Sequence, residues 1–149
     1  QIFCPGTDSG TFDYFKEVVI GKSGSMRSDI AVSEDDNVVV KGVMGDDNSL
    51  GFFGCSYYFA NKDKLRAVPI VNPKTQKAVL PNRVTIENGT YAPFSRPLFI
   101  YVNKRSLRRP EVYDFVMFCL TEGAKLSKEV GYVQLPADQY TSMKLKLTR

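Results

Sequence analysis

The stretch IFCPGTDSGTF, residues 2–12, carries the strongest structural signal in the sequence, because it changes from strand-like to helix-like within a few residues. Residues 2–4 are apolar and predict a short buried strand. Residues 5–10 have the Pro, Gly, Asp and Ser composition of a turn. From residue 11 to residue 20 the apolar side chains recur at helical spacing. The sequence therefore predicts a strand, a loop and a helix in direct succession.

The loop of this unit has the composition of an anion-binding site. The first N–H groups of a helix have no partners within the helix, and the aligned peptide dipoles make that end positive. Ser9 and Thr11 add hydroxyl donors, and Gly10 lets an anion approach the backbone closely. The alternative is that Ser9 is an ordinary helix cap. The Gly-Lys-Ser/Thr ending of a nucleotide-binding P-loop is absent.

Arg27 is a second candidate for anion binding, because it follows the Gly/Ser-rich loop of residues 21–25. A guanidinium group matches an oxyanion through two parallel hydrogen bonds. The alternative is that Arg27 pairs with Asp29 or another surface acid. A further basic cluster lacks the interleaved aromatic residues of an RNA-binding face and is interpreted as a solvated loop, with a docking patch as the alternative. Its members are Lys104, Arg105, Arg108 and Arg109.

The composition limits the chemistry that the chain can perform. Its 149 residues are 43% hydrophobic and carry a formal net charge of +4, which is typical of one globular domain or one large piece of a two-lobed protein. The sequence has no His, so Ser-His-Asp and Cys-His catalytic sites and His metal ligands are excluded. A charge of +4 is also too small to indicate nucleic-acid binding.

The three cysteines, Cys4, Cys55 and Cys119, are widely spaced and form no C-x-x-C pair, so a zinc site is not expected. They are interpreted as buried thiols. The alternative is a Cys4–Cys55 disulfide, which would require the segments that carry them to be neighbours. The chain opens on a strand-like segment without Met, so we expect a cut end with any targeting segment upstream.

The remaining elements are predicted from periodicity and capping residues. Residues 34–44 predict a helix capped by Ser33, although the three valines at 38–40 also suit a strand. Residues 50–60 are almost continuously apolar or aromatic and predict a strand that is buried on both faces. Further strands are predicted at 66–71 and 98–102, and residues 81–88 are ambiguous.

Two helices are predicted in the last forty residues. Pro110 suits the first position of a helix that Gly123 interrupts, and a last helix begins near Pro136. The alternation of strands and helices along the chain predicts an α/β fold with a mixed, mostly parallel sheet flanked by helices.

Seven stretches, taken in order, resemble the substrate-binding protein of high-affinity phosphate ABC transporters. They are residues 9–15, 33–37, 51–54, 57–58, 95–104, 109–112 and 129–136. The resemblance covers nearly the whole chain. It implies a type 2 periplasmic-binding fold, with residues 1–94 in the second lobe and residues 95–149 returning to the first. The N-terminal half of that fold is not in this chain.

The resemblance also implies the ligand residues. Ser9, Gly10 and Thr11 correspond to phosphate ligands. Some members of the family carry an Arg four residues before the Ser, where this chain has Pro5, so Arg27 is expected to supply the guanidinium.

The function implied by the resemblance is that of a non-enzymatic receptor, which binds inorganic phosphate between two lobes and delivers it to ABC transporter permease subunits. Its expected location is periplasmic or extracellular, with a lipid anchor at the membrane surface as an option. No cofactor, metal or nucleic-acid partner is expected. The alternatives are another oxyanion such as sulfate, or reuse of the fold as a ligand-free extracellular scaffold. Without His or a metal cluster, an enzyme acting on phosphate esters is disfavoured.

Overall fold

The computed structural model describes residues 1–147 and begins with the predicted strand–loop–helix unit. β1 spans Ile2–Pro5 and α1 spans Gly10–Ile20. Ser9 is the N-cap of α1, with extended backbone, and its Oγ accepts a hydrogen bond from the Thr11 N–H at 3.2 Å. A cap of this kind satisfies one of the N–H groups that the first turn leaves without a helical partner. The prediction for this unit is therefore confirmed.

A three-stranded parallel sheet lies next to α1, with the strand order β2-β1-β3. β2 spans Ala31–Ser33 and β3 spans Leu50–Gly51, and both pair with β1. Each crossover carries a helix, as parallel strands require: α1 precedes β2, and α2 (Asp36–Met44) precedes β3. A separate antiparallel pair joins β4 (Ile70–Val71) to β5 (Ala78–Val79). The predicted α/β fold with a mainly parallel sheet is confirmed.

The core of this part lies between the sheet and its helices. Cys4 in β1 is completely buried, and Val39 and Val40 of α2 are almost completely buried. The Phe15 ring of α1 stacks on Phe52 at 3.8 Å between centroids and on Phe94 at 5.5 Å. These contacts hold α1 against the segments that follow β3 and α4 (Arg83–Glu87).

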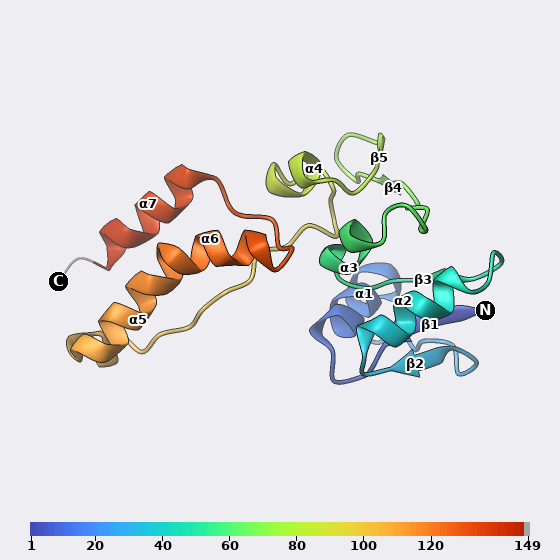
Figure 1. Cartoon of the computed structure of the whole chain (residues 1–149), viewed down its shortest axis with the longest axis horizontal. Coiled ribbons are helices and arrows are strands. Elements are labelled where there is room, and N and C mark those ends of the chain that lie inside the picture. Colours follow the sequence, from blue (N-terminus) through green and yellow to red (C-terminus); the bar gives the residue numbers. More distant parts are fainter. Residues whose placement is uncertain (148–149) are drawn as a thin grey trace.

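Three helices form a second group, which Figure 1 shows set apart from the sheet, with the extended residues 95–103 running between the two. They are α5 (Pro110–Leu120), α6 (Glu122–Glu129) and α7 (Ala137–Lys146), and a 3-10 turn, η1 (Ser106–Arg108), precedes them. Gly131 follows α6 and comes close to Ser56 in α3 (Cys55–Ala60), so that a Cβ at this position would overlap with Ser56. Its φ of +92° also favours glycine, and this residue brings the two groups together.

The strand predicted over residues 50–60 is wrong beyond its first two residues. Only Leu50–Gly51 pairs with β1, and after Gly54 the chain turns into α3. Residues 55–59 are half-buried, whereas the prediction required a strand that is fully buried on both of its faces. A short apolar run does not distinguish a strand from a packed helix by periodicity, and Gly54 supplies the break that separates the two elements.

Two other predicted strands are shorter than expected or absent. Of residues 66–71 only Ile70–Val71 forms a ladder. Residues 98–102 are extended, but among the described residues they have no strand partner. The side chains of this segment's first four residues are exposed: Leu98 is 66% exposed, Phe99 68%, Ile100 59% and Tyr101 91%. A strand needs a neighbour for its backbone groups, which local sequence does not reveal.

The helix predicted over residues 34–44 is confirmed as α2, but its cap is not Ser33. Asp35 is the N-cap, and its side chain accepts from the Asn37 N–H at 2.8 Å. Ser33 instead accepts a hydrogen bond from the Asp35 N–H at 3.1 Å. The ambiguous residues 81–88 contain α4, which starts at a capping box between Asn82 and Thr85.

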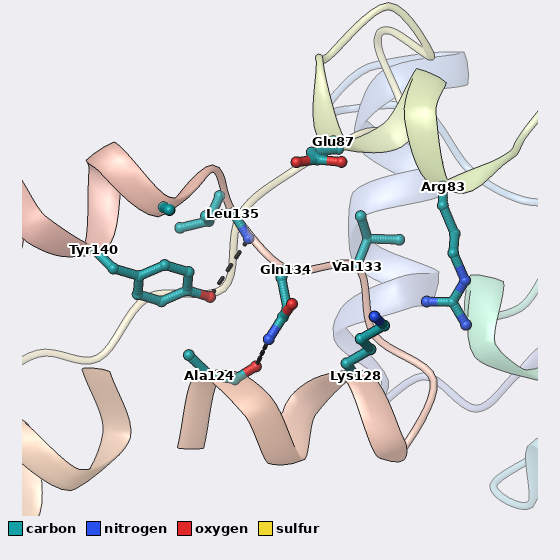
Figure 2. A pocket seen from close by; sticks show the side chains of 9 residues that line it. Arg83, Glu87, Ala124, Lys128, Val133, Gln134, Leu135 and Tyr140 are labelled. Atoms are coloured by element: carbon teal, nitrogen blue, oxygen red, sulfur yellow. Dashed lines mark hydrogen bonds between the residues drawn. The ribbon is translucent and has the colours of Figure 1, made fainter. Parts of the chain in front are cut away.

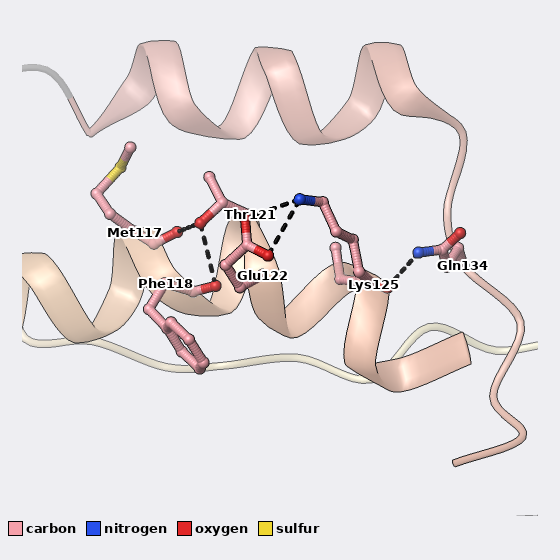
Figure 3. A network of polar contacts seen from close by, with 7 residues as sticks. Met117, Phe118, Thr121, Glu122, Lys125 and Gln134 are labelled. Atoms are coloured by element: carbon pink, nitrogen blue, oxygen red, sulfur yellow. Dashed lines mark hydrogen bonds and ion pairs between the residues drawn. The ribbon is translucent and has the colours of Figure 1, made fainter. Parts of the chain in front are cut away.

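The break between the helices near the C-terminus also differs from the prediction. It lies at Thr121, between α5 and α6, whereas Gly123 lies inside α6. Figure 3 shows the Thr121 hydroxyl donating to the carbonyl groups of Met117 (2.8 Å) and Phe118 (3.3 Å), which satisfies the end of α5. Lys125 and Glu122 form an ion pair at 2.8 Å in the next turn. The predicted last helix is confirmed as α7.

No helix within residues 1–147 is long and apolar enough to cross a membrane. The three cysteines are free thiols, so the Cys4–Cys55 disulfide left open by the sequence is not formed. Cys4 is buried as interpreted, whereas Cys55 and Cys119 are half-buried.

Candidate functional site

The candidate site lies at the carboxyl edge of the parallel sheet, where β1 and β2 end side by side. Pro5 and Ser33 pair in register, so Gly6 and Glu34 leave the sheet next to each other. Gly6 is buried, and the carboxylate of Glu34 lies over it, in the space that a side chain on Gly6 would fill. The Ser9 N–H donates to the Gly6 carbonyl at 3.0 Å, which closes the loop before α1. This edge of a parallel sheet is where α/β proteins bind ligands.

The structure brings Ser9, Gly10 and Thr11 together at the N-terminus of α1, as the sequence predicted. Ser9 and Thr11 are half-buried and Gly10 is exposed. Beyond Gly10's own chain neighbours and helix backbone, a Cβ at this position would have one described atom within 4 Å, Nη2 of Arg96 at 3.4 Å. The first turn therefore presents backbone N–H groups on an accessible surface. An anion at this helix end would replace the Ser9 hydroxyl as the acceptor for Thr11.

Among the described residues, the hydrogen bonds and the ion pair of the Arg27 guanidinium go to Asp29 and not to this loop. Nε donates to Oδ1 at 2.8 Å and Nη2 to Oδ2 at 2.6 Å, a two-point pair in which both side chains are about two-thirds exposed. The hydrogen bond from Arg27 lowers the pKa of Asp29, and the same bond raises the pKa of Arg27. This is the arrangement that the sequence left open as the alternative for Arg27.

Arg96 is the arginine that the structure places at the α1 N-terminus. Its Nη2 donates to the carbonyl of Gly10 at 3.1 Å, and its guanidinium lies 4.8 Å from the centre of the Tyr14 ring. The contact joins residues that are 86 positions apart. Sequence reasoning missed Arg96, because no local pattern links residue 96 to residue 10.

Two hollows in the surface lie away from the predicted ligand residues. Figure 2 shows the larger, of about 420 Å³, where Arg83 and Glu87 of α4 face Lys128 of α6 and the start of α7. Within it, Gln134 donates to the carbonyl of Ala124, and the Leu135 N–H lies 3.4 Å from the Tyr140 hydroxyl. The smaller, of about 250 Å³, lies along the second half of α1. Among residues 1–147, no group of three or more Cys, Asp or Glu side chains is arranged to hold a metal.

The chain is similar in sequence to proteins named SphX and to phosphate-binding proteins named PstS. It is 49% identical to the protein SphX of Synechococcus elongatus over 142 residues, which cover 95% of this chain and 42% of the relative. It is 42% identical to SphX of Synechocystis, covering 100% of this chain and 44% of the relative. It is 36% identical to the phosphate-binding protein PstS of Staphylococcus saprophyticus, covering 99% of this chain and 45% of the relative. No protein-family profile matches the chain.

The fold is similar to that of a solved structure, described as a possible phosphate-binding protein from Planctomyces limnophilus. The TM-score is 0.86 and the identity 45%, over 99% of this chain and 52% of the solved chain. In sequence and in fold, the chain matches the phosphate-binding substrate-binding proteins, and the resemblance predicted from the sequence is confirmed. The chain spans less than half the length of the curated relatives that it matches.

Proposed function

We propose that this chain contributes one side of a binding site for inorganic phosphate in a non-enzymatic receptor. The observation that carries the proposal is the position of Ser9, Gly10 and Thr11 at the N-terminus of α1, on the carboxyl edge of the parallel sheet. Phosphate would accept hydrogen bonds from the N–H groups of Gly10 and Thr11 and from the Ser9 or Thr11 hydroxyl. Relatives named for phosphate binding at 36% identity support this choice of ligand.

Arg27 belongs to the proposed site as a phosphate ligand whose side chain must move to reach the anion. Its side chain is exposed and its partner Asp29 lies only two residues away, so no buried contact holds it in place. To reach an anion at α1, the guanidinium would exchange the Asp29 carboxylate for phosphate oxygens, which offer the same two-point geometry.

Isothermal titration of the full-length protein with phosphate, and with sulfate in competition, tests the ligand. Phosphate binding that equimolar sulfate does not displace supports a phosphate receptor. Preference for sulfate would favour the other-oxyanion alternative, and no binding of either anion would favour a ligand-free scaffold. The variant Thr11→Val, which keeps the shape of the side chain but removes its hydroxyl, should weaken phosphate binding.

We further propose that residues 1–94 form the second lobe and that residues 95–149 return to a first lobe completed by an upstream half. The apolar side chains of residues 98–101 are exposed in an extended segment, which suits a strand that pairs with a sheet elsewhere in the protein. The relatives, which are more than twice as long as the matched region, are compatible with such a half.

Residues 1–149 alone should then bind phosphate far more weakly than the longer protein. A one-sided site leaves the anion open to water, so that each hydrogen bond contributes only its net ~0.5–1.5 kcal/mol. Titration of both forms with phosphate tests this prediction, and equal affinities would contradict a site shared between two lobes. In the longer protein we propose delivery of phosphate to ABC transporter permease subunits from a periplasmic or extracellular location, with a lipid anchor as an option.

A further inference from the structure

Residues 93–96 run along the first turns of α1 and are held there by three kinds of contact. The Tyr14 hydroxyl donates to the carbonyl of Pro93 at 2.5 Å. The ring of Phe94 stacks on Phe15 at 5.5 Å between centroids. Arg96 then donates to the carbonyl of Gly10 at 3.1 Å. This stretch, which includes the start of the extended residues 95–103, is therefore fixed to the helix that starts at the candidate site.

Arg96 approaches the N-terminus of α1 with its charge uncompensated. Its two observed partners, the Tyr14 ring and the Gly10 carbonyl, carry no net charge. Arg96 takes part in none of the ion pairs within residues 1–147. A guanidinium has five N–H donors, and the contact with Gly10 uses one of them. Arg96 differs in this respect from Arg27, whose Nε and Nη2 both donate to the carboxylate of Asp29.

A divalent phosphate at this helix end needs more positive charge than the helix supplies. The partial charge at a helix N-terminus is only about half of one elementary charge. Negatively charged side chains near the phosphate would increase this deficit of positive charge, and the loop itself contains Asp8. A cation beside Gly10 reduces this deficit, and the planar fork of an arginine is suited to two oxygens of the same anion.

We propose that Arg96 is an anion-binding residue of the α1 site and supplies the positive charge that a divalent phosphate requires there. This inference rests on the proposed function. Because Arg96 also begins the segment that joins the sheet to α5, α6 and α7, an anion that engages its guanidinium acts on the position of that segment as well. Arg96 thus links occupancy of the site to the connection between the two parts of the chain.

The test is titration of the full-length protein with inorganic phosphate, in the wild type and in Arg96→Gln and Arg96→Lys. Arg96→Gln should lower the affinity at least about tenfold, as expected when one partner of a close charge pair is removed. Arg96→Lys keeps the charge but not the fork, so it should recover part of the loss. Arg108→Gln is the matched control, because Arg108 is an exposed arginine on η1, and it should bind phosphate as the wild type does.

Salt dependence separates a charge effect from a structural one. If Arg96 attracts the anion, affinity should fall less steeply with added sodium chloride in Arg96→Gln than in the wild type, because screening then acts on one charge fewer. Loss of packing alone would lower the melting temperature and leave the salt slope unchanged. If Arg96→Gln binds phosphate with the affinity and the salt dependence of the wild type, the inference about Arg96 is wrong. The proposed function still holds in that case, provided that the wild type binds phosphate.

Two further outcomes are decisive. If the wild type does not bind phosphate, both the inference and the proposed function are wrong. If Arg96→Gln does not fold, Arg96→Lys decides: affinity within about tenfold of the wild type, with the wild-type salt slope, supports a charge role. Abolished binding in a folded Arg96→Lys, which keeps the charge, overturns it.

Discussion

The carboxylate of Glu34 occupies the space beside Gly6 that a side chain at position 6 would fill. The two residues follow β2 and β1, whose last residues, Ser33 and Pro5, pair in register. Glycine at position 6 therefore lets an acidic side chain of the neighbouring strand close over the start of the loop. The close approach ties the loop before α1 to the residue that precedes the α2 cap.

Gly6→Ala should destabilise the protein by about 1 kcal/mol, because the new methyl group forces the Glu34 side chain to turn away. The cost is limited because the displaced atoms are the end of a flexible side chain. Urea unfolding of Gly6→Ala, Glu34→Ala and the double variant measures the coupling. The double variant should be less destabilised than the sum of the single changes, and strict additivity would show that the two residues do not interact.

The thiols should react in an order set by burial. Burial raises the pKa of Cys4, which is completely enclosed, and burial is also the largest cause of the raised pKa of Cys55. A raised pKa lowers the fraction of reactive thiolate at a given pH, so both thiols should react more slowly than a free cysteine at pH 8 and faster as the pH rises further.

An Ellman assay without reductant measures this directly. Three thiols should react in denaturant, and Cys4 should be protected in the native protein. A single reactive thiol in denaturant would instead indicate that two of the three cysteines form a disulfide, and peptide mapping would show whether they are Cys4 and Cys55.

Ser95 carries a buried hydroxyl that has no hydrogen-bond partner among the described residues. Removal of an unpaired buried polar group does not sacrifice a hydrogen bond. Ser95→Ala should therefore leave stability unchanged or increase it by up to about 1 kcal/mol, measured by thermal unfolding. Ser95→Thr serves as a control that keeps the hydroxyl. A loss of stability in Ser95→Ala alone would contradict this and show that the hydroxyl has a hydrogen-bond partner.

The parts of the fold that were predicted correctly are those coded by local sequence. The loop composition of residues 5–10, the helical spacing of residues 11–20 and Pro110 at a helix start each act within one or two turns. Residues 50–60 were predicted wrongly because a short aromatic run packs equally well as strand or helix. Residues 98–102 were predicted as a strand from their composition, but a ladder depends on a partner that local sequence does not specify.

The same distinction applies to the candidate site. Ser9, Gly10 and Thr11 are adjacent in sequence, so their meeting at one helix end could be predicted. The approach of Arg96 to Gly10 depends on the path of the chain over 86 positions and has no signal in a single sequence. For Arg27 the nearby Asp29 was a competitor visible in the sequence, and the structure has that pair.

The observed ion pair of Arg27 with Asp29 and its proposed role in binding phosphate compete for the same guanidinium. Its two hydrogen bonds to Asp29 occupy the face that phosphate would need. Arg27 lowers the pKa of Asp29 through their hydrogen bond, and the ionised carboxylate competes with the anion for the guanidinium. Asp29→Asn weakens this competitor and should leave phosphate affinity unchanged or increase it.

Arg27→Ala should lower phosphate affinity at least about tenfold in the full-length protein, and Arg27→Lys should recover only part of it. The pair with Asp29 is exposed, so its loss should have little effect on thermal unfolding. Binding losses at unchanged melting temperature would therefore report on the anion and not on folding. If Arg27→Ala and Asp29→Asn both bind phosphate like the wild type, Arg27 is only a surface ion pair, and the charge at the site comes from Arg96 and the helix end.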